Sequence, residues 1–595
     1  MSVFETVYYE TDVCVVGGGL AGMCAAISAA RHGAKVVLMQ DRPMLGGNAS
    51  SEIRMWVCGA HGRDHAETGI IEELKLENLY RNPDMNYSIW DGILYEAVRF
   101  QPGITLLLNC SCLDVGMDGT RVQWIKGWQM TTQTYQQVSA QIFIDCSGDS
   151  VLAPLTGAMY RHGREARDEF DEDIEPQVAD RKTMGMSCML QARQEPTPNT
   201  FIPPVWAYKI TEEDLAHRHP DMSQPTENFW YLELGGENDT IHDTEWLRDE
   251  LLKTAYGIWD YIKNDPAQKD KHKYWHLDWV GMLPGKRESR RYVGDYIMTQ
   301  NDVRAEGRFD DLIAYGGWTM DDHHPAGFRT PEPPNIFHPA PSPYGIPYRC
   351  LYSRNIENLM FAGRNISVSH AAMSSTRVMA TCSLLGQAVG TASAIAIEEG
   401  LSPRGVYEQK IRKLQELLMD DDCWLPFRAR PIPEKTQNAV FLYIKDGQQY
   451  PEPALECLKN GLDRPDGNNY NGIRLKPSDG LQMDLREPAR LHRIRLVFDS
   501  DLNRETEPEP IARLNRNMIH NRPLNWPEAC VPKTLPKVFK IYGVQADGTE
   551  VLLAQETCWH QRLAVYPVHG IFSAIRLEIL ECWGDEAGLF AMEAE

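Results

Sequence analysis

Three glycines near the N-terminus have the spacing of a phosphate-binding turn. Gly17, Gly19 and Gly22 form a G-x-G-x-x-G pattern between the apolar segment 12–16 and the helix-forming segment 23–33. The first glycine of such a pattern permits a tight turn, the second lets the backbone approach a pyrophosphate, and the third lets the helix pack closely on the strand. The N–H groups at the helix start, around Leu20 and Ala21, would face the phosphates. The pattern predicts a dinucleotide site, and the alternative is a glycine turn with a structural role alone.

A second group of polar residues follows the next predicted strand. An acidic residue about 20 positions after the glycines ordinarily accepts hydrogen bonds from the ribose hydroxyls. In this chain Gln40 ends the strand 35–39, and Asp41 and Arg42 come next. The amide of Gln40 can hydrogen-bond a ribose, and the carboxylate of Asp41 competes for the same role. Both stay candidates for the ribose contact.

Four later segments carry a more specific signal. They are PMLGGNASSEIR at 43–54, the apolar run that ends near Cys112, the strand 141–145 that runs into Cys146-Ser147-Gly148-Asp149, and LMFAGRN at 359–365. In FAD enzymes of the glutathione-reductase fold, similar segments lie beneath the pyrophosphate and flavin, meet the adenine, form a Gly-Asp turn and contact the ribityl chain. The last segment leads through Arg377 into a helix around Gln387. The N-terminus of that helix could stabilise negative charge on a reduced flavin.

Together these segments resemble a family of FAD-dependent oxidoreductases that carries a GGNASSEIR-type loop and a GKRESRR-type segment, here at 46–54 and 285–291. The resemblance covers about residues 10–400 and implies an α/β FAD-binding Rossmann-like domain. It also implies that FAD contacts the following residues: Gly17, Gly19, Leu20, Ala21, Gly22, Gln40, Asp41, Arg42, Gly46, Gly47, Asn48, Ser51, Cys112, Ser147, Gly148, Gly363, Arg364, Asn365, Arg377 and Gln387.

The pattern along the chain predicts a divided cofactor domain and a separate C-terminal domain. We expect the FAD-binding domain at 1–160 and 350–423, an inserted α+β substrate or cap region at 161–349, a linker at 424–434 and a β-sandwich at 435–595. In the inserted region, Trp246, Leu251 and Ile258 have the spacing of a helix with one face in the core. After the linker, Ile494, Leu496 and Phe498 alternate with Arg493, Arg495 and Val497, as in a strand. This part resembles discoidin and galactose-binding-like modules, which bind sugars or serve only in assembly. We favour the assembly role here.

A flavin oxidoreductase needs few protein groups, because the flavin takes the hydride and the protein orients the substrate and removes a proton. We expect His370 to be the base, as a neutral imidazole, with His324 as second choice. Arg54 and Arg290 would hold substrate oxygens. For each of these residues, and for His61 and His323, the alternative is an ordinary structural role. No third ligand accompanies the His and Asp residues at 321–324, so no metal is expected.

The leading functional hypothesis is an FAD-dependent oxidoreductase that oxidises a CH–OH group of a sugar-like or polyol-like small molecule. The first alternative is a reductase or dehydrogenase that acts on a carbon–carbon bond beside a carboxylate held by arginines. The second alternative is a carbohydrate-binding protein without enzymatic activity. The family resemblance supports sugar-like substrates, because members often accompany carbohydrate-degrading enzymes.

Composition limits the partners. The chain has 595 residues, 60 Lys and Arg against 83 Asp and Glu, and a net charge of −23, which disfavours nucleic-acid binding. The most apolar stretch, 382–397, contains Gln, Ser and Thr and is short for a bilayer, so a buried helix and no membrane contact are expected. The N-terminus lacks the features of a secretory signal, and the 14 cysteines are scattered, which favours a cytoplasmic protein with reduced thiols. A homo-oligomer is compatible with these properties.

Overall fold

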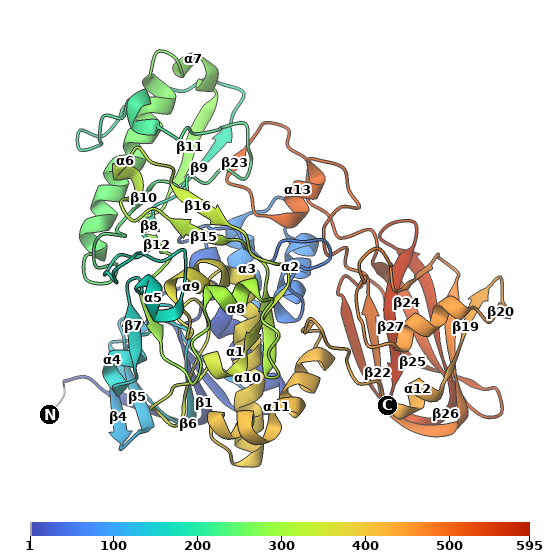
Figure 1. Ribbon diagram of the computed structural model, residues 1–595. Coiled ribbons are helices and arrows are strands. Elements are labelled where there is room, and N and C mark those ends of the chain that lie inside the picture. The colour runs from blue at the N-terminus through green and yellow to red at the C-terminus, as the bar shows by residue number, and fades with distance from the viewer. Residues whose placement is uncertain (1–2) are drawn as a thin grey trace. The chain divides into compact units, whose positions relative to one another are not determined.

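The computed structural model describes residues 3–595, and a seven-stranded sheet organises its N-terminal part (Figure 1). The strands are β1 (Thr6–Val16), β2 (Val36–Met39), β3 (Ile104–Leu107), β4 (Cys110–Asp118), β5 (Arg121–Gln129), β6 (Thr134–Asp145) and β18 (Leu359–Phe361). The order is β3-β2-β1-β6-β5-β4, with β18 beside the C-terminal end of β6. Strands β1, β2, β3, β6 and β18 run parallel, whereas β4, β5 and β6 form an antiparallel meander. The segments that follow the parallel strands therefore meet at one edge of the sheet.

Two apolar helices, α1 (Leu20–Arg31) and α10 (Met379–Glu399), pack closely against each other beside this sheet. Glycines make the contact: a Cβ at Gly386 would lie 2.0 Å from the Ala21 carbonyl oxygen, and a Cβ at Gly390 would lie 2.3 Å from that of Ala25. Among the described helices α10 alone has the length and hydropathy to cross a membrane, and 94% of its apolar window is buried inside the protein. The segment 382–397 is thus a buried helix, as predicted.

The region between β6 and β18 forms small sheets and a long helix. The paired strands are β8 (Met186–Ser187), β10 (Glu233–Leu234) and β12 (Gly285–Lys286); β9 (Leu190–Gln194), β11 (Trp275–Val280) and β23 (Asn521–Arg522); β7 (Tyr160–His162) and β13 (Arg290–Tyr292); β14 (Leu312–Gly316) and β17 (Tyr344–Pro347); β15 (Met320–His323) and β16 (Asn335–His338). Helix α6 (Thr244–Asn264) buries Leu251 and Ile258 as predicted. Trp246 is instead 47% exposed, and the Arg329 guanidinium lies over its ring.

The remaining helices are short, apart from three. They are α2 (Ile70–Arg81), α3 (Tyr87–Arg99), α4 (Leu152–Thr156), α5 (Arg167–Phe170), α7 (Lys269–His272), α8 (Gln300–Arg304), α9 (His370–Thr376), α11 (Pro403–Asp420), α12 (Glu434–Asn438) and α13 (Ile511–Arg516). Helix α9 comes directly before α10 and begins at a serine N-cap, Ser369.

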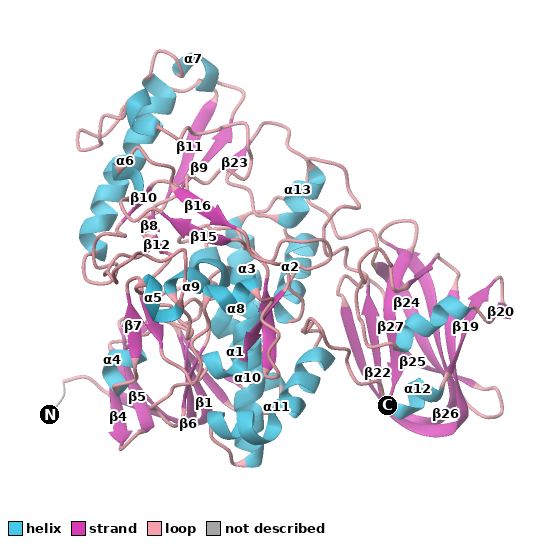
Figure 2. Cartoon of the chain, viewed as in Figure 1, coloured by secondary structure: helices cyan, strands magenta, loops and turns pink. Residues whose placement is uncertain are grey.

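The C-terminal part is an antiparallel β-sandwich in which strands dominate (Figure 2). Its strands are β19 (Val440–Lys445), β20 (Gln448–Tyr450), β21 (Ile473–Leu475), β22 (Gly480–Phe498), β24 (Pro536–Val544), β25 (Glu550–Glu556), β26 (Leu563–Cys582) and β27 (Ala587–Ala594). Ile494, Leu496 and Phe498 are buried, in agreement with the alternation along β22. Arg495 and Val497 are buried as well, because β22 is covered on both faces and Arg495 pairs with Asp463 at 3.1 Å.

The chain forms two compact units, and each unit contains three separate segments of the sequence. The predicted domain boundaries contain fewer such exchanges. The first unit holds the chain up to His61, Met85–Gln415 and Asn517–Pro527, and the second holds Gly62–Asp84, Glu416–Arg516 and Glu528–Glu595. The predicted boundaries at 160, 350 and 435 do not include these exchanges. Strand β23 explains one of them, since it pairs in parallel with β9 of the first unit. Such long-range pairing leaves no local mark in the sequence.

Candidate active site

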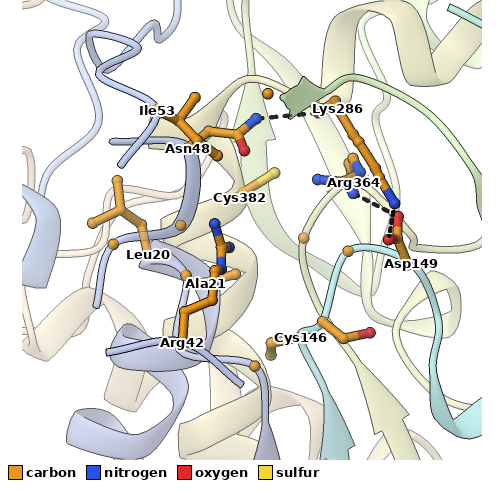
Figure 3. Close-up of a pocket in the computed structure, with 18 of the residues that line it drawn as sticks. Leu20, Ala21, Arg42, Asn48, Ile53, Cys146, Asp149, Lys286, Arg364 and Cys382 are labelled. Atoms are coloured by element: carbon orange, nitrogen blue, oxygen red, sulfur yellow. Dashed lines mark hydrogen bonds and ion pairs between the residues drawn. The ribbon is translucent and has the colours of Figure 1, made fainter. Parts of the chain in front are cut away.

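A cavity of about 410 Å³ opens at the edge of the sheet where the parallel strands end (Figure 3). Most of the predicted cofactor residues line it: Gly17, Gly19, Leu20, Ala21, Gln40, Asp41, Arg42, Gly46, Gly47, Asn48, Cys112, Ser147, Gly148, Gly363, Arg364 and Arg377. The structure brings these residues together because each follows a parallel strand, stands in strand β4, or precedes α10. Gly22, Ser51, Asn365 and Gln387 do not line the cavity.

The glycine turn has the geometry that the pattern predicts. Gly17 has a φ of +99°, and a Cβ there would lie 2.5 Å from the backbone of Cys146. A Cβ at Gly22 would lie 1.8 Å from the Gly17 carbonyl oxygen, so Gly22 serves close packing and not cofactor contact. Gly19 differs from both, since a Cβ there would meet only the Cα of Gly47, at 3.8 Å. The backbone at Gly19 is therefore open toward the cavity.

The two candidates for the ribose contact are separated by their hydrogen bonds. The Gln40 side chain is buried, accepts from Gly18 N at 2.6 Å and donates to the Met44 carbonyl at 3.0 Å. The amide of Gln40 therefore links the glycine turn at Gly18 to the loop at Met44. The Asp41 side chain is 60% exposed and lies 3.6 Å from the Arg42 guanidinium. Asp41 is the more accessible acceptor for a ribose hydroxyl.

Several buried polar atoms beside the cavity lack a partner within the described chain. They are Arg364 Nε, Asn365 Oδ1 and Thr376 Oγ1. Buried polar atoms in native proteins nearly always have a hydrogen-bond partner, so these three indicate a polar ligand. The first residues of α10, from Met379, also line the cavity and present the positive end of the helix dipole. These features fit a cofactor with a pyrophosphate and a polar ring edge, as FAD has.

Basic side chains dominate the cavity wall. Arg42, Lys286, Arg287, Arg364 and Arg377 line it, against the carboxylates of Asp41 and Asp149. Figure 3 shows Asp149 between Lys286 and Arg364, each at 2.8 Å. Burial alone would raise the pKa of Asp149, but these two cations lower it to about 2. Asp149 is therefore ionised, and the wall stays cationic overall.

The GKRESRR segment places two of its basic residues in the cavity wall, and the predicted Arg290 is not one of them. Lys286 and Arg287 face the cavity, whereas Arg290 lies over the Tyr160 ring and Arg291 is buried in ion pairs with Glu165 and Glu288. The pairing of β13 with β7 turns this part of the segment away from the cavity. A run of basic residues does not indicate which of them faces a ligand.

His370, the predicted neutral base, has a different role in the structure. The side chain is 2% exposed and does not line the cavity. Nδ1 lies 2.9 Å from the Glu288 carboxylate, and Nε2 lies 3.3 Å from that of Asp322. Burial alone would lower the pKa of His370, but these carboxylates raise it well above the ordinary value of 6.5. His370 is therefore an imidazolium held by acids and not a neutral base.

The other predicted catalytic residues also lie outside the cavity wall. His324 Nδ1 accepts from Ala326 N at 3.1 Å, which caps a turn. The Arg54 guanidinium lies 4.4 Å from the centroid of the Trp279 ring, and its Nε donates to the Ser51 carbonyl at 3.2 Å. His61 is exposed beside a tryptophan ring. Among the described residues no group of three or more His, Cys, Asp or Glu side chains is arranged for a metal ion.

The environment of His370 predicts a stability effect. His370→Asn removes the cation that lies between Glu288 and Asp322, and although Glu288 keeps Arg291, we expect a loss of about 3–5 kcal/mol in the free energy of unfolding. Because the folded-state pKa of His370 is raised, its contribution is complete below the ordinary value of 6.5 and is lost as pH rises through the raised value. Urea denaturation of both proteins at several pH values should show a difference that shrinks as pH rises. A variant of unchanged stability would contradict this role.

The fold and the cavity define a flavin-binding oxidoreductase, and comparison with known proteins agrees. A family model described as FAD dependent oxidoreductase matches residues 12–418, and the chain belongs to that family. This match confirms the predicted cofactor, FAD, and the predicted class of enzyme.

Individual relatives match over short segments only. Digoxin reductase of Eggerthella lenta is 48% identical over 54 residues, 9% of each chain. Fumarate reductase (cytochrome) of Shewanella frigidimarina is 60% identical over 38 residues, 6% of this chain and 7% of the relative. The chain thus spans less than a tenth of these curated relatives.

Solved structures give distant likenesses. A geranylgeranyl bacteriochlorophyll reductase-like protein of Thermoplasma acidophilum is 13% identical, with a TM-score of 0.30, over 70% of this chain and 84% of that one. A family 32 carbohydrate-binding module of Streptococcus pneumoniae EndoD is 13% identical, with a TM-score of 0.19, over 26% of this chain and 94% of the module.

Proposed function

We propose that this FAD-dependent oxidoreductase acts on an organic acid, and that the reaction forms or removes a carbon–carbon double bond beside the carboxylate. When bound, FAD supplies the hydride donor or acceptor for this reaction. The chain itself would bind the acid, orient it and keep water away from the reacting carbon. The predicted oxidation of a sugar-like CH–OH group stays a second hypothesis for the same experiment.

The observation that carries the proposal is the pair of arginines in the cavity wall. Arg287 and Arg377 both line the cavity. Burial lowers the pKa of Arg287, and the like charge of Arg377 lowers it further, although Glu233 opposes both effects. Two guanidinium groups that line one cavity, where the charge of Arg377 lowers the pKa of Arg287, favour a bound anion, and the planar fork of a guanidinium suits a carboxylate.

Hydrogen bonds fix the orientation of both arginine side chains. Arg287 donates through Nη1 to the Ser187 hydroxyl at 3.0 Å and through Nη2 to the Trp230 carbonyl at 2.9 Å. Arg377 Nη2 donates to the Asp321 carbonyl at 3.2 Å, while its Nε has no partner within the described chain. Arg377 therefore keeps a donor available for a ligand, next to the N-terminus of α10.

The cavity wall gives less support to alcohol oxidation. That reaction needs a group that takes the hydroxyl proton. The described residues that line the cavity include no histidine, and Asp149 is a weak base because Lys286 and Arg364 lower its pKa to about 2. Two relatives are named as reductases, of fumarate and of digoxin, which agrees with the proposal, although each match covers less than a tenth of either chain.

Anaerobic spectroscopy of the bound flavin tests the proposal. Photoreduced protein would be mixed with fumarate or crotonate, and oxidised protein with the corresponding saturated acids. The matched controls are the neutral amides of the same acids. We expect electron exchange with at least one acid and none with its amide. If neutral sugars or polyols reduce the flavin while every acid is inert, the proposal is wrong and the CH–OH hypothesis takes its place.

A further inference from the structure

A series of ionic side chains, called here the bridge, links the two cavity arginines, Arg377 and Arg287, through the protein interior. From Arg377 it runs to Asp321 at 3.3 Å, from Asp321 to His323 Nε2 at 3.2 Å, and from His323 Nδ1 to Glu233 at 2.5 Å. It ends at Arg287, whose Nη1 lies 3.4 Å from Glu233. The charges alternate along the bridge, and both ends line the cavity. His323 stands at the centre and is 3% exposed.

The hydrogen bonds define the protonation of the central ring. Each ring nitrogen of His323 faces a carboxylate oxygen, and an ionised carboxylate can only accept. Both contacts are complete only when the ring carries both protons. The bridge then holds three cations and two anions, and the cavity end keeps a net positive charge. A ring with one proton would direct a lone pair at one of its two carboxylates.

The neighbours of the bridge fix its geometry. Glu233 also accepts from Gly185 N at 2.6 Å, and Asp321 accepts from the Asn335 amide at 2.5 Å. Asp322, next in β15, is the other charged group near His323, and it pairs with the imidazolium of His370. The Trp230 ring packs against the imidazole, with 5.2 Å between centroids and 66° between the ring planes. The ring thus has acidic partners from β10 and from β15, and little water reaches it.

We propose that His323 is a positioning residue that, as an imidazolium, fixes the direction of Arg287 and Arg377 and makes this end of the cavity selective for anions. For its substrate the inference rests on the proposed function, whereas the charge of the ring and the binding of anions do not. His323 acts through the arginines and takes no part in the transfer of hydride. A ring with one proton would lose its hydrogen bond to one of the two carboxylates, and the arginine paired with that carboxylate would be less firmly oriented.

The experiment uses the FAD-loaded full chain and oxalate as the probe anion. Oxalate binding would be followed by the change in flavin absorbance for the unmodified protein, for His323→Gln, and for His324→Gln as the matched control. We expect His323→Gln to weaken oxalate about tenfold or more. His324→Gln should bind oxalate as the unmodified protein does. The neutral diamide of oxalate is the second probe: loss of anion selectivity in His323→Gln weakens oxalate alone, whereas a purely structural role would weaken both probes.

Nitrogen-15 NMR of the histidine rings gives a readout that needs no variant. Because each ring nitrogen faces a carboxylate, we expect both nitrogens of His323 to carry a proton. A neutral ring, or unchanged oxalate affinity in folded His323→Gln, would overturn the inference. If oxalate binding and ring charge are as expected while no organic acid exchanges electrons with the flavin, the proposed function fails and the role of His323 stands.

Discussion

Gly19→Val is expected to give a folded, colourless protein. The backbone at Gly19 has a φ of −66° and a ψ of 175°, which any residue adopts, so valine adds no backbone strain. Its Cβ would meet only the Cα of Gly47, at 3.8 Å, and the rest of the side chain would enter the cavity. A pyrophosphate must approach the backbone at that point. The variant therefore loses cofactor space without losing packing.

The measurement is the ratio of FAD to protein after purification, from the visible and ultraviolet absorbance. We expect this ratio to decrease at least about tenfold, because the pyrophosphate can no longer approach the backbone. Gly92→Val is the matched control, because a Cβ at Gly92 in α3 meets no atom within 4 Å. Circular dichroism establishes that both variants are folded. Full FAD content in folded Gly19→Val would contradict the assignment of the site.

Gly22 shows why the choice of glycine matters. A Cβ there would lie 1.8 Å from the Gly17 carbonyl oxygen, so any side chain at Gly22 disrupts the turn itself. Loss of FAD in a Gly22 variant could come from unfolding of the turn. Loss of FAD in Gly19→Val reports on the cavity alone, because the protein has room for the new side chain.

The cofactor half of the site could be predicted from the sequence because local chemistry specifies it. Gly17 needs its positive φ, Gly22 needs its missing side chain, and each predicted loop follows a short apolar strand. In a parallel sheet the ends of such strands meet at one edge, so their order along the chain is enough to bring the loops together. The FAD site is therefore visible in the sequence before any contact is known.

The catalytic half could not be predicted in the same way, because distant residues define it. The sequence around His370 gives no sign that Glu288 and Asp322 face its two nitrogens, and these two carboxylates change a base into a buried cation. Likewise Arg287 and Arg290 stand three residues apart, and only the pairing of β13 with β7 shows which one is turned away. Contacts between residues far apart in the chain determine the charge of the His370 ring and the side to which each arginine points. A single sequence does not show these contacts.

Arg377→Met is expected to leave FAD bound and to slow the reaction with an organic acid by about 10²–10³ in kcat/KM. Methionine keeps the apolar stem but removes the guanidinium of this cavity-lining residue. The glycine turn, the Gly-Gly loop and the strand ends are unchanged, so cofactor binding should persist. Arg377→Lys keeps the charge without the planar fork and should recover only part of the rate.

Arg290→Met makes the same chemical change at a guanidinium outside the cavity wall, over the Tyr160 ring. It is the matched control, and its rate should stay close to that of the unmodified protein. Stopped-flow measurement of flavin oxidation at several acid concentrations separates binding from the chemical step. If Arg377 only binds the acid, KM rises at constant kcat; if it also stabilises charge that develops on the carboxylate, kcat falls too. A decrease in Arg290→Met with none in Arg377→Met would reverse the assignment, and would show that the substrate approaches from the side of β13.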